Sequence, residues 1–250
     1  MPGPLIEVEG VWFRYPGSEA YVLRGASLRV LRGDFLAVVG ENGSGKSTLL
    51  MLIAGLLRPE RGRVLFEGRD IRSLLPGVRR RLGVVFQDPD DQLFNASVYD
   101  EIAYTPRQLG WSSDLVRRRV AELAELLGIE PLLHRHPLKL SYGEKKLVAV
   151  AAALAHDPDV LILDEPTAYL SGGRARLVLN LLDRLHRELQ MCISDRGRTV
   201  VAASHDPRVV RRAGSVALLS EGRLRLYGSA EAALGDPPVL DALGLGGESD

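Results

Sequence analysis

The sequence has a single cysteine, Cys192, so no disulfide can form within the chain. One thiol is compatible with a reducing compartment such as the cytosol. The formal net charge is zero, and without a basic surplus nothing global favours nucleic acid or an anionic membrane as a partner. We therefore expect no nucleic-acid partner.

Long apolar runs and a signal peptide are also missing. The longest apolar stretches, such as 148–155, are far shorter than the roughly 20 residues that a helix needs to cross a bilayer. The N-terminus lacks the charged-then-apolar pattern of a secretory signal. We expect no direct membrane insertion, so that any role at a membrane depends on a partner.

Glycine, by contrast, is concentrated at residues 40–48, which read Gly-Glu-Asn-Gly-Ser-Gly-Lys-Ser-Thr. Glycines allow successive backbone N–H groups to point at one anion. Lys46 adds a charge for the β- and γ-phosphates, and Ser47 offers a hydroxyl to Mg²⁺. The segment predicts a nucleoside-triphosphate site formed by Gly40, Asn42, Gly43, Ser44, Gly45, Lys46, Ser47 and Thr48.

The flanks of this loop favour the same interpretation. The unbroken apolar run at 35–39 is typical of a strand buried on both faces. Residues 47–54 can begin a helix whose positive N-terminus faces the phosphate. The alternative, a glycine-rich surface turn before a helix, does not require a buried strand in front of it.

A second chemical element is the pair Asp164 and Glu165, which ends the apolar run 160–163. Two carboxylates at the end of a buried strand carry a desolvation cost unless they have partners. Beside the phosphate loop, Asp164 would hold Mg²⁺, usually through water, and Glu165 would polarise the attacking water. The alternative is a strand that leaves the sheet by a capped turn at 164–167.

The third element is the S-x-x-E capping box formed by Ser141 and Glu144, ahead of a helical run at 145–155. Such a helix end presents free N–H groups and a partial positive charge, so it can receive an anion. Considered alone, the pattern is equally that of an ordinary helix cap.

The rest of the chain predicts an α/β fold. Alternating residues in the first 30 positions suggest short antiparallel strands with a turn at Pro16-Gly17. Apolar runs separated by helical segments predict a mostly parallel sheet, with strands at 82–86, 160–163, 199–203 and 216–219. Residues 97–138 show no strand pattern and are predicted to be a helical insertion, with an amphipathic helix at 116–127. From about residue 228 the chain is expected to end in a loose tail.

Taken in order, these elements resemble the ATPase subunits of ATP-binding cassette (ABC) transporters over nearly the whole chain. The resemblance implies a P-loop NTPase core with a mostly parallel sheet, an antiparallel β subdomain and a helical insertion subdomain. It implies one ABC ATPase domain at 1–250, divided into a RecA-like core with the antiparallel subdomain at 1–87 and 158–227, a helical and signature subdomain at 88–157, and a tail at 228–250.

The same resemblance implies roles for further residues. Tyr15 would stack on adenine, and Gln87 would be a switch glutamine that touches Mg²⁺ and the lytic water. His205 would sense the γ-phosphate. Ser141 and Gly143 would belong to the signature motif. With Lys46 and Glu165, these residues imply a Mg²⁺-dependent ATPase whose cofactors are ATP and Mg²⁺, the metal being held by Ser47, Gln87 and Asp164.

ATPase subunits of this family pack head to tail, with the phosphate loop of one facing the signature helix of the other. The resemblance therefore implies a second ABC ATPase subunit as partner. A narrower similarity, in 86–94 and 144–146, is to the energy-coupling-factor importers of transition-metal ions, cobalt or nickel, or vitamins. It implies a transmembrane coupling subunit that docks near residues 88–110, and a cytoplasmic location, peripheral on the inner face of the cell membrane.

Two positions depart from the family pattern. Tyr142 replaces the first glycine of the usual Ser-Gly-Gly signature. The sequence Tyr169-Leu170-Ser171 stands where a Gly-Leu-Asp turn is usual, and that aspartate helps couple the two ATP sites of a dimer. The change predicts weaker coupling, or asymmetric pairing with a different ATPase subunit.

Two alternative functions remain from other classes. One is a soluble ABC-type ATPase in DNA repair or regulation. Such proteins insert a long coiled coil between the switch glutamine and the signature, for which the spacing here leaves no room. The other is a non-catalytic nucleotide-binding regulator, which would need neither Glu165 nor His205.

Overall fold

The structure, a computed structural model, describes residues 3–191 and 198–246, so Cys192 lies outside the described residues. The described strands form one antiparallel sheet in the order β2-β1-β4-β5 and one six-stranded sheet in the order β10-β9-β3-β8-β7-β6. Their bounds are β1 Ile6–Phe13, β2 Leu23–Val30, β3 Phe35–Val39, β4 Arg61–Phe66, β5 Arg69–Asp70, β6 Leu82–Val85, β7 Val160–Asp164, β8 Thr199–Ala203, β9 Ser215–Ser220 and β10 Arg223–Tyr227.

The six-stranded sheet is parallel except for β10, which pairs with β9 in the antiparallel sense. In β3, Phe35, Ala37 and Val39 belong to one apolar core, and Leu36 and Val38 belong to the other. Successive side chains of a strand point to opposite faces, so a strand covered on both sides has no polar position. This explains the unbroken apolar run, and the mostly parallel sheet predicted from the sequence is confirmed.

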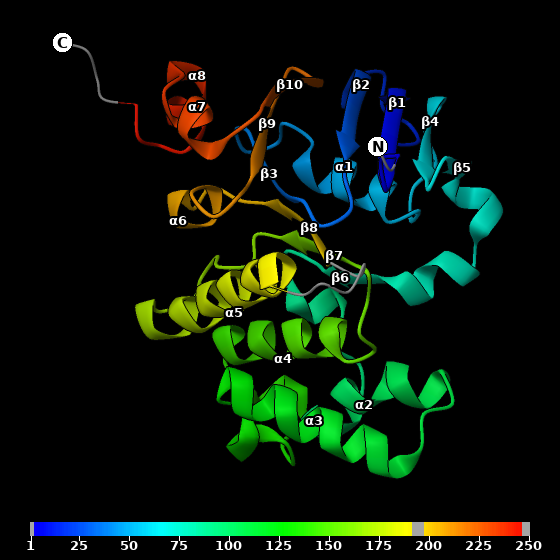
Figure 1. Cartoon of the computed structure of the whole chain (residues 1–250), viewed down its shortest axis with the longest axis vertical. Helices are drawn as coiled ribbons and strands as arrows, with labels where there is room; N and C mark the ends of the chain where they lie inside the picture. The colour runs from blue at the N-terminus through cyan, green and yellow to red at the C-terminus, as the bar shows by residue number, and fades with distance from the viewer. Residues whose placement is uncertain (1–2, 192–197, 247–250) are drawn as a thin grey trace.

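Helices cover this sheet on both sides. Figure 1 shows α1 and the antiparallel sheet on one side, and α4, α5 and the α2–α3 pair on the other. The bounds are α1 Lys46–Ile53, α2 Val98–Gln108, α3 Ser113–Leu127, α4 Tyr142–Leu154, α5 Gly172–Met191, α6 Pro207–Val210, α7 Ala230–Leu234 and α8 Pro237–Ala242. None of the helices within the described ranges is long and apolar enough to cross a membrane.

Residues 97–138 hold helices and short 3₁₀ turns without a strand, as predicted. The amphipathic pattern of α3 is also confirmed, because Val116, Val120 and Leu123 are buried on its inner face. Ser112 begins this helix by accepting a hydrogen bond from the backbone N–H of Leu115 at 3.3 Å.

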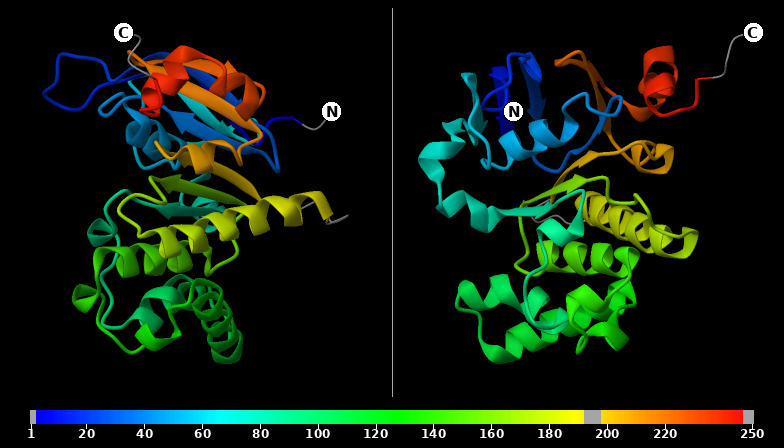
Figure 2. Two further views of the ribbon diagram at one scale, coloured as in Figure 1. Left: turned by 90° about the vertical axis from the view of Figure 1, so that its left-hand side faces the viewer. Right: turned by 180° about the vertical axis from the view of Figure 1, so that it is seen from behind.

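The expectation of a loose tail after about residue 228 is wrong for residues 228–246. Helices α7 and α8 lie beside β9 and β10 (Figure 2), and Ala233, Val239 and Ala242 are buried in the core on that side of the sheet. Helices of five and six residues are too short to produce a recognisable 3.6-residue period, which explains the error.

The sequence also gave no signal for β4, β5 or β10. Strand β4 begins with the exposed Arg61 and Arg63, and β10 alternates arginine with partly exposed leucine at the edge of its sheet. Both are held by pairing with a neighbour, β1 in one case and β9 in the other. Strand β4 lies between β1 and β5, and β10 is at the edge of its sheet; such strands depend on pairing more than on their own apolar pattern.

Candidate functional site

The topology brings four chemically distinct segments to one edge of the parallel sheet. Strands β3, β8, β7 and β6 are consecutive neighbours and run in the same direction. Their carboxyl ends therefore meet at one edge, where ligands of open α/β sheets bind. The phosphate loop follows β3, His205 follows β8, the carboxylate pair ends β7, and Gln87 follows β6.

The phosphate loop requires glycine at two positions for steric reasons. A Cβ on Gly45, whose φ is +102°, would lie 2.6 Å from Cγ1 of Val22. A Cβ on Gly40 would lie 2.4 Å from the carbonyl oxygen of Leu219 in β9. The loop is thus packed tightly between β9 and the segment before β2, which fixes where its backbone amides point.

Lys46, the first residue of α1, is buried beneath this loop. Its ammonium donates to the carbonyl oxygens of Gly40 at 2.8 Å and Glu41 at 3.0 Å. Burial lowers the pKa of Lys46, while the neighbouring Glu165 and Asp164 oppose that shift. The loop carbonyls and the two carboxylates together hold a cation beside the loop amides.

The carboxylates Asp164 and Glu165 are both buried. Burial raises the pKa of Asp164, and the adjacent Ser47 hydroxyl opposes this shift. Burial likewise raises the pKa of Glu165, opposed chiefly by His205. Oδ1 of Asp164 has no hydrogen-bond partner among the described residues, so this buried oxygen is an available ligand.

Glu165 and His205 face each other across the β7–β8 edge. Oε1 of Glu165 lies 3.3 Å from Nε2 of His205, and the His205 backbone N–H donates to Oε2 at 3.3 Å. Nε2 also lies 3.1 Å from Nζ of Lys46. On the other side of the ring, Nδ1 of His205 donates to the carbonyl oxygen of Ala242, at the end of α8, over 3.2 Å. Sequence reasoning missed this C-terminal contact because Ala242 contributes only its backbone.

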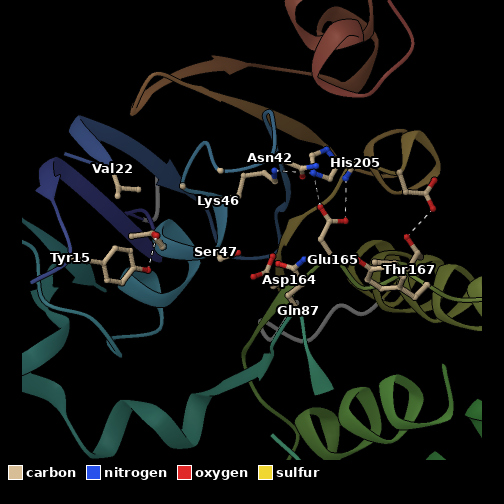
Figure 3. A pocket seen from close by; sticks show the side chains of 16 residues that line it. Tyr15, Val22, Asn42, Lys46, Ser47, Gln87, Asp164, Glu165, Thr167 and His205 are labelled. Atoms are coloured by element: carbon tan, nitrogen blue, oxygen red, sulfur yellow. Dashed lines mark hydrogen bonds and ion pairs between the residues drawn. The ribbon is translucent and has the colours of Figure 1, made fainter. Parts of the chain in front are cut away.

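These groups line one cavity of about 700 Å³. Figure 3 shows side chains from separate segments turned toward the same space. The cavity includes most of the residues predicted from the sequence: Tyr15, Asn42, Gly43, Gly45, Lys46, Ser47, Thr48, Gln87, Asp164, Glu165 and His205.

Tyr15 lies at the far end of this cavity from His205 (Figure 3). Its hydroxyl lies 3.0 Å from Oγ1 of Thr48, so either atom can donate. The exposed fraction of Tyr15 is 42%, and this aromatic surface is the kind on which a base can stack. Val22 and Thr167 also line the cavity; sequence reasoning missed both, because neither has a motif of its own.

The remaining predicted residues lie outside the cavity wall. Gly40 and Ser44 lie on the side of the phosphate loop that faces β9, and a Cβ on Gly40 would also meet Oγ of Ser44. Ser141 and Gly143 are at the start of α4 and do not line the cavity. The predicted capping box is present: Ser141 Oγ accepts from the Glu144 N–H, and a Glu144 carboxylate oxygen accepts from the Ser141 N–H at 2.8 Å.

The oxygen atoms in the cavity suit a hard cation. Ser47, Gln87 and Asp164 all line it, and Mg²⁺ is usually held by one or two carboxylates together with phosphate oxygens. The described part of the chain contains no cluster of three or more His, Cys, Asp or Glu that could hold a metal by itself. The residues present therefore fit a Mg²⁺ ion that is bound jointly with a nucleotide.

Comparison with known proteins identifies the family of the chain. The family model described as ABC transporter matches residues 23–168, from β2 to just beyond the carboxylate pair. The chain belongs to this family. It is an ABC ATPase, which binds and hydrolyses ATP.

Relatives of this ABC ATPase carry more specific names. It is 42% identical to an energy-coupling factor transporter ATP-binding protein of Symbiobacterium thermophilum, over 98% of this chain and 86% of that protein. A solved structure of cbiO1 from Clostridium perfringens, part of the ABC transporter complex cbiONQ, has a TM-score of 0.79 at 35% identity, covering 97% of this chain and 95% of the other. The ATP-binding cassette MJ0796, a dimer solved with ADP and Pi, has a TM-score of 0.79 at 27% identity, with coverages of 89% and 98%.

Proposed function

We propose that this ABC ATPase powers a membrane importer of a transition-metal ion, cobalt or nickel, or of a vitamin, by ATP-driven closure of a head-to-tail dimer. The observation that carries the dimer is the composition of the cavity wall. The described wall contains the phosphate loop, Gln87, the carboxylate pair and His205, but neither Ser141 nor Gly143. A signature motif absent from its own site fits a site that a second subunit completes.

Within that site, each side chain has a proposed role. Lys46 and the loop amides bind the β- and γ-phosphates, and Tyr15 stacks on the base. Glu165 accepts a proton from the attacking water; burial raises the pKa of this carboxylate, which makes it a stronger base. His205 contacts the γ-phosphate. Mg²⁺, held by Ser47, Gln87 and Asp164, would neutralise charge on the phosphates when bound.

In this proposal the transported substrate contacts the membrane partner and not the ATPase. We therefore propose a peripheral location on the inner face of the membrane, with residues 88–110 contacting that partner. Phe94 supports this surface: its exposed fraction is 67%, and its ring lies edge-to-face against Tyr104, 5.0 Å between centroids. Exposed aromatic residues are frequent anchors at protein interfaces.

The test is purification of the full chain from membranes, followed by identification of the proteins that accompany it and by uptake assays with labelled Co²⁺, Ni²⁺ and vitamins. Phe94→Asp should remove the transmembrane protein from the preparation. The matched control is Leu31→Asp, since Leu31 has an exposed fraction of 51% but lies in the antiparallel subdomain. Recovery of the parent chain without any membrane protein would contradict the proposal.

The dimer has its own test at Ser171, where the family pattern has an aspartate. Ser171→Asp should raise cooperative ATPase activity, by about fivefold if the coupling free energy is at the lower end of its usual range. The measurement is the ATP dependence of the rate with its Hill coefficient, at several protein concentrations. An unchanged Hill coefficient and rate would argue against weakened coupling in the parent chain.

A further inference from the structure

Two of the residues that depart from the family pattern, Tyr142 and Tyr169, touch each other. Tyr142 is the first residue of α4, and Tyr169 lies in the turn that follows the carboxylate pair. Their ring centroids are 5.2 Å apart at an interplanar angle of 76°, an edge-to-face contact that aromatic pairs favour. Two departures that are far apart in sequence therefore form one contact in space.

The hydroxyl of Tyr142 also forms a hydrogen bond with the backbone of Gln87. It donates to the carbonyl oxygen of Gln87 at 2.9 Å. Lys146, one helical turn later on the same face of α4, donates to the same oxygen at 2.9 Å. A carbonyl oxygen has two lone pairs, so these two donors use the whole acceptor capacity of the Gln87 carbonyl.

Lys146 ties the same helix to the strand that carries the metal-binding carboxylate. Its ammonium is completely buried, and it also donates to the carbonyl oxygens of Phe86 at 2.8 Å and Asp164 at 3.0 Å. An ammonium has three N–H donors, and each has an acceptor here. Burial lowers the pKa of Lys146 to about 8. Lys146 does not line the nucleotide cavity, so its contacts are with the framework of the site.

The backbone at Tyr169 is strained for a tyrosine. Its φ is +60°, a region that glycine adopts without cost and other residues adopt at a cost. Its side chain is largely exposed, so burial does not offset that strain. The edge-to-face contact with Tyr142 is the interaction that fixes this ring, and it connects the turn after Glu165 to the start of α4.

We propose that Tyr142, Tyr169 and Lys146 form an intrachain latch that positions Gln87 and moves it together with the signature helix and the turn after Glu165. Tyr142 and Lys146 are positioning residues that act through the Gln87 backbone and the β7 end, whereas Tyr169 also lines the nucleotide cavity. A movement of α4 is then transmitted directly to the Gln87 amide, whose side chain lies beside Asp164 in the cavity (Figure 3). The inference rests on the role proposed for Gln87.

Tyr142→Phe tests the latch because it removes one hydroxyl and keeps the ring pair. In the full chain we expect kcat for ATP to fall about three- to tenfold, the effect of one lost hydrogen bond, with the KM for ATP within about twofold. The Mg²⁺ concentration that gives half-maximal activity should rise, because Gln87 is a proposed metal ligand. Purely structural damage would not shift this Mg²⁺ dependence selectively.

The same substitution in a Gln87→Ala background tests whether Tyr142 acts through Gln87. Single-turnover assays with excess enzyme measure the residual rate, and Tyr142→Phe should then have no further effect, since residues that act through one group are not additive. Tyr169→Gly should also lower kcat, although glycine relieves the backbone at φ +60°. Tyr21→Phe is the matched control, because it removes a hydroxyl that donates to Glu60 at 3.2 Å and keeps another edge-to-face pair, with Trp12; it should keep the parent kcat.

Parent-like kcat and Mg²⁺ dependence in Tyr142→Phe would overturn the latch while leaving the role of Gln87 intact, provided that Gln87→Ala is impaired. If Tyr142→Phe lowers the rate of ATP hydrolysis equally with and without Gln87, Tyr142 does not act through Gln87. If Gln87→Ala hydrolyses ATP at the parent rate, the proposed role of Gln87 is itself wrong, and the latch falls with it.

Discussion

Two helix starts in this protein are suited to an anion, and they are built in opposite ways. Helix α1 begins at Gly45 without a side-chain cap and without an acidic residue in its first turn. Helix α4 begins at Ser141 with a complete capping box that includes Glu144. Arg174 of α5 adds hydrogen bonds to Glu144 at 3.0 Å and to Ser141 at 3.3 Å.

This difference determines which helix start can bind an anion by itself. The first amides of any helix lack partners within the helix, and they carry a partial positive charge. At α1 no side-chain cap and no acidic residue of the first turn offsets that charge, and Lys46 adds to it. At α4 the Glu144 carboxylate already does so, and nearby hydrogen bonds lower the pKa of Glu144, so that it stays ionised. We therefore expect a phosphate to bind at α1, and to reach α4 only in the proposed dimer.

The largest expected effect is the loss of anion binding at the start of α1. Lys46→Ala removes the buried cation beside the loop amides and should weaken ATP hydrolysis by at least about 100-fold, the usual effect of one lost electrostatic donor at a transition state. Nucleotide binding and hydrolysis are measured together. Lys139→Ala, which removes an exposed lysine, is the control and should leave both unchanged.

The next effect separates binding from hydrolysis within the same site. Glu165→Gln should keep ATP binding and dimerisation while turnover falls about 100- to 10,000-fold, as expected for a lost general base. Equilibrium binding, size-exclusion chromatography with ATP and single-turnover hydrolysis provide the three readouts. Hydrolysis at the parent rate would show that Glu165 is not the base.

A smaller effect tests whether the α4 start is more than a cap. Ser141→Ala should lower the free energy of unfolding by about 1 kcal/mol through the lost N-cap, and it should also lower ATPase activity. Ser112→Ala removes the equivalent cap of α3, so it should reduce stability similarly and leave activity unchanged. Equal activities of the two variants would reduce Ser141 to a structural residue.

The last effect is on stability alone and concerns the other end of α4, where His156 is buried and Nε2 donates to the Leu82 carbonyl at 3.2 Å. Burial lowers the pKa of His156 in the folded chain, so below about pH 6.5 the unfolded chain binds the proton more readily. Stability should therefore fall with decreasing pH, by at most about 1.4 kcal/mol per pH unit.

Denaturant unfolding at pH 7.5 and pH 5.5 measures this difference. His156→Gln, which has no group that titrates in this range, should lose less stability than the parent between the two pH values. An identical loss in both proteins would mean that other groups cause the acid sensitivity.

Sequence reasoning succeeded where a local pattern sets the structure. The run 35–39 predicted β3 because a strand covered on both faces excludes polar side chains, and Ser141 with Glu144 predicted the cap of α4 because both partners lie within one turn. It failed for α7 and α8, because helices of five and six residues are too short to show a 3.6-residue period. It also failed for β10, because a sheet edge tolerates the exposed arginines that hide the strand pattern.

What the sequence determined by itself is the phosphate loop, since its glycines, Lys46 and Ser47 are consecutive and their chemistry depends on local backbone conformation. The tertiary structure determines which groups from distant segments lie beside that loop. Parallel pairing brings Glu165 and His205 to one edge, and the return of the C-terminus places Ala242 against His205. The contact of Tyr142 with Tyr169 is likewise tertiary, because the packing of α4 against the end of β7 sets it.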